Sequence, residues 1–184
     1  IWTALAAAAA LWLALHCAGR LFVWWNTGRR LSVWLPFTVD VTYMDNHGGF
    51  HGDGETICTM TFSGAAGERL TERLEESERW YPFPAPEPIR QLIYEEPLAD
   101  SFHGTFAETA GIGAPEEGYW FFADRDTSDN YGREGGPDLY GMEAVERLEE
   151  RGREKENGHF WPFNFDLAVY APQTHTLYFF AFDI

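Results

Sequence analysis

The chain has 184 residues and a formal net charge of −16, from 29 acidic and 13 basic side chains. Residues 1–36 contain three arginines and no acids, so residues 37–184 together carry a charge of −19. This acidity argues against nucleic-acid binding, which needs a basic face, and it disfavours adsorption to anionic lipid. The two cysteines indicate neither a disulfide framework nor a zinc site.

The N-terminal segment is predicted to be a transmembrane helix. Residues 1–19 carry no charge, and a bilayer core needs about 20 apolar residues in a helix. We predict a membrane span over residues 1–25 and a juxtamembrane linker over residues 26–36. Three tryptophans fit the interfacial aromatic belt of such a span: Trp24, Trp25 and Trp34. The membrane, contacted through this helix, is therefore the partner that the sequence predicts.

Two alternatives for this segment stay open. One is a cleavable signal peptide, whose apolar core is shorter. The other is a lipoprotein signal ending at Cys17, against which the bulky His16 argues. The orientation of a true span is also contested. Arg20, Arg29 and Arg30 follow the apolar run, and the positive-inside tendency would keep that flank in the cytoplasm.

Residues 37–184 are predicted to form a soluble domain. Alternating apolar and polar residues predict strands in three segments and a β-hairpin in a fourth: 37–45, 55–62, 118–125 and, for the hairpin, 163–184. Leu70 and Leu74 predict an amphipathic helix over 68–80, and a surface helix is expected within 141–158. The predicted fold class is α+β, with about five mainly antiparallel strands and one or two helices packed on one face.

A cluster of charged residues and glycines, DNHGGFHGDGE, joins the first two predicted strands. Its candidate ligand-binding residues are Asp45, His47, His51, Asp53 and Glu55. Imidazole and carboxylate groups suit zinc and other transition ions. The four glycines, however, favour a tight turn that merely carries polar side chains, since metal ligands must be held in place. The identity of any metal stays unknown, and no cofactor is expected.

No catalytic residue can be assigned from the sequence. The histidines and serines lie outside any recognisable nucleophile motif such as GxSxG. Residues 124–138 are interpreted as a solvated polar loop, which together with the glycine-rich turn would form an exposed, variable surface.

Three segments resemble a family of small uncharacterised bacterial proteins: HGGFHGDGE, GYWFFADR and FNFDLAVYAPQTHTLYFFAFD. Members of that family combine a membrane or lipoprotein anchor with a GGF-GDGE turn and a closing aromatic hairpin. The resemblance covers roughly residues 39–184, although residues 141–158 do not match the family pattern. It implies a bacterial origin and an anchored domain outside the cytoplasm, but no activity.

The expected function is therefore a non-enzymatic, membrane-anchored domain that binds a protein or another ligand at the cell envelope. One alternative is a metal-dependent hydrolase in which His47, His51, Asp53 and Glu55 hold a metal-bound water as the nucleophile. The other is an immunity or inhibitor protein whose acidic face blocks a basic partner.

Overall fold

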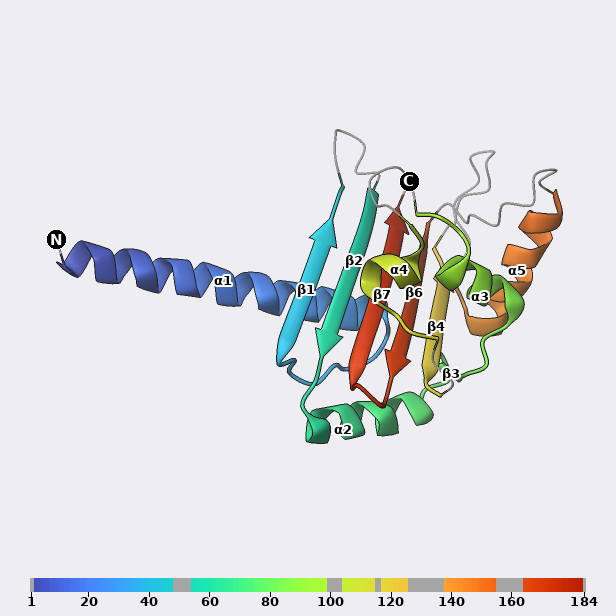
Figure 1. The fold of residues 1–184 in the computed structure, drawn as a ribbon, viewed down its shortest axis with the longest axis horizontal. Coiled ribbons are helices and arrows are strands. Elements are labelled where there is room, and N and C mark those ends of the chain that lie inside the picture. The colour runs from blue at the N-terminus through green and yellow to red at the C-terminus, as the bar shows by residue number, and fades with distance from the viewer. Residues whose placement is uncertain are drawn as a thin grey trace.

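A computed structural model describes residues 2–47, 54–98, 104–114, 117–125, 138–154 and 164–183. Its centre is a seven-stranded sheet in the order β1-β2-β7-β6-β4-β3, with β5 also paired to β4 (Figure 1). All of these pairs are antiparallel. The strands are β1 (Asp40–Asp45), β2 (Gly54–Thr61), β3 (Tyr81–Pro82), β4 (Tyr119–Asp124), β5 (Leu139–Tyr140), β6 (Phe165–Ala171) and β7 (Thr176–Asp183). The predicted α+β class is confirmed.

The sheet has more strands than the five expected, because two of its strands are very short. Both β3 and β5 contain two residues, which is too few for an alternating pattern to appear in the sequence. The C-terminal hairpin is confirmed: β6 and β7 are joined by a turn over residues 172–175 and pair along their full length. The other three predicted strand segments correspond to β1, β2 and β4.

The described residues form five helices beside the sheet: α1 (Trp2–Arg30), α2 (Gly64–Glu75), α3 (Glu87–Tyr94), α4 (Phe106–Ala110) and α5 (Gly141–Glu154). They lie on both of its faces, whereas helices on one face were expected. One core joins α3, α4 and α5 to inward side chains such as Phe122 and Phe165. The other joins α2 and the end of α1 to residues such as Phe121 and Phe179. Successive strand side chains point to opposite faces, so each strand feeds both cores.

Helix α2 begins and ends earlier than the predicted range of 68–80. It starts at Gly64, and its last turn closes at Glu75. Two glycines in its first turns mask its start in the sequence, because glycine disfavours helix. Trp80 lies beyond the helix and donates a hydrogen bond from its indole nitrogen to the carbonyl of Leu31 (3.2 Å). Leu70 and Leu74 are buried against the sheet, as the helical spacing predicted.

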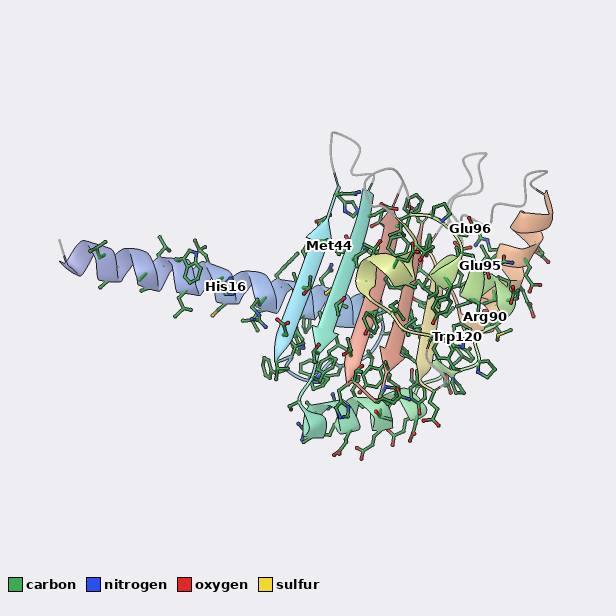
Figure 2. All side chains as sticks on the ribbon, in the orientation of Figure 1. His16, Met44, Arg90, Glu95, Glu96 and Trp120 are labelled. Atoms are coloured by element: carbon green, nitrogen blue, oxygen red, sulfur yellow. The ribbon has the colours of Figure 1, made fainter. Side chains whose placement is uncertain are left out.

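Helix α1 has two parts that differ in their surroundings. The side chains of residues 9–19 are exposed, and this part projects past the edge strand β1 (Figure 1). His16 lies in the projecting part (Figure 2). The C-terminal part packs on the sheet: Val23 and Trp24 contact the second core, and Thr27 is buried. Within the part of the chain that the structure describes, one helix, α1, is long enough and apolar enough to cross a membrane.

Candidate functional site

The predicted ligand-binding residues are only partly brought together. His51 and Asp53 lie outside the described residues. Asp45 ends β1, His47 follows it, and Glu55 lies near the start of β2. Asp45 is paired in register with Thr56, and Glu55 is paired with Phe182. The three described candidates are thus close in the sheet but are distributed between its two faces.

Asp45 and His47 form a local pair at the end of β1. The Asp45 carboxylate lies 2.5 Å from Nδ1 of His47 and accepts a hydrogen bond from its backbone nitrogen at 3.0 Å. The hydroxyl of Tyr43 donates a third bond to the same carboxylate (3.0 Å). Partial burial alone would raise the pKa of Asp45, but the bonds from His47 and Tyr43 outweigh it and lower this pKa. The pair therefore favours an ionised carboxylate.

Glu55 is separated from this pair by strand alternation. It is 1% exposed and lies two residues before Ile57 on β2, so both side chains point to the face of the sheet that packs against α3 and α4. Its near partner is Asn46, whose side-chain oxygen accepts the backbone N–H of Glu55 and whose amide nitrogen reaches the Glu55 carboxylate at 3.4 Å. Among the described residues, no three His, Cys, Asp or Glu side chains are grouped so that they could hold a metal ion.

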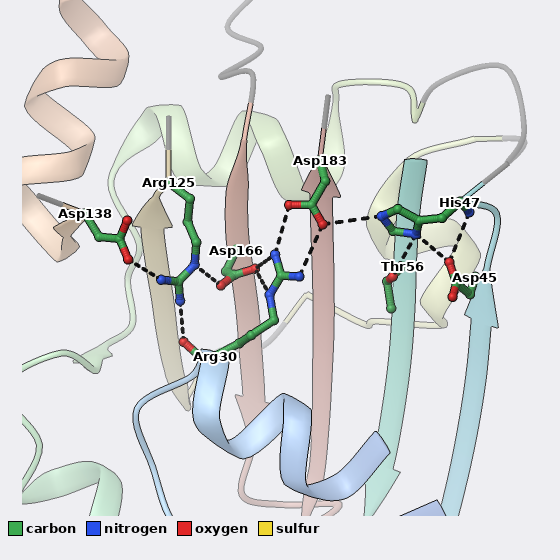
Figure 3. A network of polar contacts seen from close by, with 8 residues as sticks. All are labelled: Arg30, Asp45, His47, Thr56, Arg125, Asp138, Asp166 and Asp183. Atoms are coloured by element: carbon green, nitrogen blue, oxygen red, sulfur yellow. Dashed lines mark hydrogen bonds and ion pairs between the residues drawn. The ribbon is translucent and has the colours of Figure 1, made fainter. Parts of the chain in front are cut away.

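The other ring nitrogen of His47 leads into a network that sequence reasoning missed (Figure 3). His47 Nε2 lies 3.3 Å from Oδ2 of Asp183, near the end of β7. Asp183 in turn accepts two hydrogen bonds from the guanidinium of Arg30, each 3.2 Å long. Arg30 is the last residue of α1, so the network joins the tip of the sheet to the helix.

Asp166, near the start of the central strand β6, is the centre of the network. It is fully buried and is held between two guanidinium groups, from Arg30 (2.6 Å) and Arg125. Arg125 also bonds Asp138 at 2.5 Å. Burial raises the pKa of Asp166, and the two arginines act in the opposite direction. Burial would lower the pKa of Arg30, but Asp166 and Asp183 outweigh it and raise that pKa. The arginines thereby compensate a charge that would otherwise be costly to bury.

The segment after α1, residues 31–39, is named here the return segment because it doubles back beside the helix. Arg125 donates to the carbonyl of Arg30 (2.7 Å), which satisfies one of the unpaired carbonyls at the helix end. Arg73 donates to the carbonyl of Trp34 (2.6 Å), and Arg79 donates to the Ser32 hydroxyl (2.5 Å). Arg73 of α2 and Arg79, which follows α2, thus hold the return segment, and Arg125, which follows β4, holds the end of α1.

Residues 26–36, expected to be a juxtamembrane linker, are in fact part of the folded domain. Helix α1 continues through them to Arg30, past the predicted end of the span at Trp25. Leu31 and Leu35 then insert into the second core and are 0% and 1% exposed. The apolar side chains of this segment cover one face of the sheet, and their burial stabilises a fixed junction relative to a free linker.

A shallow pocket of about 460 Å³ lies at this junction, lined by Asn26, Arg29, Arg30, Arg125 and Asp183. Its amide, guanidinium and carboxylate groups can hydrogen-bond a small polar ligand. Arg30, Arg125 and Asp183 already serve the ion-pair network. The arrangement is therefore best explained as a structural connection between helix and sheet.

Comparison of the chain with protein-family models, with curated proteins and with solved structures finds no match. The family resemblance inferred from the sequence therefore stays an expectation, and functional reasoning depends on the geometry of the chain itself.

Proposed function

We propose that this chain is a single-pass, membrane-anchored domain that binds a protein partner at a bacterial cell envelope. The observation that carries the proposal is the projecting part of α1. No residue of the apolar stretch that could cross a membrane is buried, and the projecting part of the helix extends away from the sheet (Figure 1). An apolar helix left uncovered is unfavourable in water, and a bilayer removes that cost.

A binding role is supported by where the charges of the domain lie. Exposed glutamates line the outer side of α2, among them Glu68, Glu72 and Glu76. The arginines Arg73 and Arg79 instead turn toward the return segment. Arg69 is exposed on α2 as well, but the glutamates outnumber it, so this surface has a net negative charge, which suits a protein partner with a basic patch.

The proposal places the domain outside the cytoplasm, as the family resemblance implies. Three arginines after the apolar run argued for the opposite orientation. One of them, Arg30, has a structural role in the ion pairs with Asp166 and Asp183, which is reason enough for its presence. Labelling Met142→Cys with a membrane-impermeant maleimide in intact cells tests the orientation, because Met142 is exposed on α5. Labelling only after permeabilisation would place the domain in the cytoplasm.

Carbonate extraction of membranes tests the anchor. The wild-type chain should stay with the membrane pellet. Leu11→Lys combined with Leu15→Lys should release it, since each lysine at a helix centre costs roughly 2.5–3.5 kcal/mol of insertion free energy. The control is Met142→Lys, which adds charge to an exposed domain position and should leave the chain in the pellet. Release of the wild-type chain would refute the anchor.

Affinity capture from solubilised membranes tests the partner. The acidic-surface proposal expects capture that weakens with salt. It should also be lost when Glu68 and Glu72 are changed to Gln. The matched control changes the exposed Glu87 and Glu95 of the opposite sheet face to Gln. Equal capture by both double variants would exclude α2 as the binding surface.

A further inference from the structure

The junction between α1 and the sheet places one edge of the domain where the projecting helix would enter a bilayer. Arg20 marks the boundary, because its guanidinium donates to the carbonyl of Val39, directly before β1 (3.5 Å). Residues 9–19 before it are exposed and carry no charge, whereas a guanidinium favours the headgroup region over the hydrocarbon core. In the proposed anchor, Arg20 and the end of the return segment beside it therefore lie at the level of the membrane surface.

Large apolar side chains are exposed at this same level. Phe37, Trp34 and Val39 of the return segment are 74%, 60% and 60% exposed. Trp24 stacks on Phe37 and meets Trp34 edge-on, both at 5.3 Å between ring centroids. We name this surface the aromatic collar: Trp24, Trp25, Trp34, Phe37 and Val39. Aromatic side chains favour the interfacial region between headgroups and acyl chains.

We propose that the aromatic collar lies in the interface of the bilayer that receives α1, so that the β1 edge of the sheet faces the membrane. This inference rests on the proposed membrane anchor. Lipid is the occupant that the geometry supports, because Phe37 and Val39 line one pocket with Leu21 and Trp24 of α1, so the collar adjoins the apolar surface of the helix in space. Among the described strands, β1 pairs with β2 alone, and an exposed sheet edge is prone to pairing with other chains. A bilayer beside it blocks that approach.

The collar cannot swing away from the membrane independently of the helix. Trp24 donates from its indole nitrogen to the carbonyl of Pro36 (3.0 Å), which ties the return segment to α1. Arg73, Arg79 and Trp80 bind the same segment from the domain side. The domain is thereby held in one orientation, with β1 proximal to the membrane and β3, at the other end of the sheet order, distal.

Charges of both signs lie beside the collar. Arg29 lines a pocket with Trp24 and Trp34, Arg20 lines a pocket with Trp24 and Phe37, and Asp40 follows Val39. Zwitterionic phosphatidylcholine, which carries no net charge, therefore tests the contact without attracting or repelling either sign.

Site-specific fluorescence in vesicles tests the proposal on the full chain. In a Cys17→Ser background, single cysteines at Leu13, Phe37, Val39 and Met142 carry an environment-sensitive NBD label. Cys58 stays silent because it is buried. Vesicles of phosphatidylcholine are prepared with and without nitroxide-labelled acyl chains, and iodide is added as the aqueous quencher. Phe37, Val39 and Met142 are all exposed, so their replacement leaves the cores intact.

The label at position 13 reports the membrane span, and the labels at 37 and 39 report the collar. We expect lipid nitroxide to quench positions 13, 37 and 39, and iodide alone to quench position 142. Iodide quenching at 37 and 39 equal to that at 142, with position 13 still quenched by lipid, would overturn the collar while leaving the anchor intact. Iodide quenching at 13 would instead overturn the anchor. Shielding of 37 and 39 from both quenchers would show a protein on the collar, and would equally overturn the proposal.

Discussion

Replacing Asp166 with Asn should destabilise the domain strongly, because this carboxylate holds the end of α1 to the centre of the sheet. Asp166 is fully buried between Arg30 and Arg125. Removing one partner of a buried ion pair costs about 3–5 kcal/mol. The lower end applies here, because Arg30 keeps Asp183 and Arg125 keeps Asp138. We therefore expect a loss of about 3 kcal/mol in the free energy of unfolding.

Urea unfolding of the detergent-solubilised chain, followed by tryptophan fluorescence, measures this loss. With a slope near 2 kcal/mol per M, a loss of ~3 kcal/mol lowers the midpoint by about 1.5 M urea. The control is Glu87→Gln, which removes a pair with Arg90 whose side chains are 58% and 53% exposed. Such a pair contributes less than about 1 kcal/mol. If Asp166→Asn moved the midpoint no further than this control, the buried ion pairs of Asp166 would not be a source of stability.

Three further predictions concern the packing of the domain. Leu35→Ala should lower the free energy of unfolding, measured in urea, by about 2–5 kcal/mol, because the residue is 1% exposed. No change would indicate that Leu35 belongs to a linker. Gly67→Ala should lower the melting temperature, since a Cβ there lies 2.2 Å from Nδ1 of His175, whereas Gly64→Ala meets only an ordinary contact at 3.9 Å and should not. Burial raises the pKa of the Cys58 thiol to about 12. The stability tied to the protonated thiol is therefore lost only as pH rises toward that value. Maleimide should leave this thiol unmodified at pH 9 unless the domain is unfolded.

The parts of the fold that could be predicted are those with a long local pattern. The hairpin of β6 and β7 has fifteen strand residues, rich in aromatic and aliphatic side chains, on either side of a short polar turn, and Leu70 and Leu74 fix the apolar stripe of α2. Strands of two residues, such as β3, offer no pattern and depend on their neighbour β4 for their conformation. The location of helices on both faces also escaped prediction. Strands such as β4, buried on both sides, indicate two covered faces in retrospect.

The candidate site was predicted from nearness in sequence, and strand alternation decided its outcome. Asp45 and His47 meet on the face of the sheet that also holds Thr56, the register partner of Asp45. Glu55 precedes Thr56 on β2, so its side chain points to the opposite face. The Arg30–Asp166 pair joins residues 136 positions apart, so no local pattern could reveal it. The available signal was a lone aspartate within the apolar strand β6, which needs a buried cation.

The reactivity of Cys17 shows whether the projecting part of α1 lies within a bilayer. This thiol is exposed in the isolated chain and lies on that part of the helix. In lipid vesicles it should resist a water-soluble maleimide, even when urea unfolds the domain and exposes Cys58. Dissolving the vesicles in sodium dodecyl sulfate should allow both thiols to react. Rapid labelling of Cys17 in intact vesicles would show that this part of the helix lies outside the bilayer.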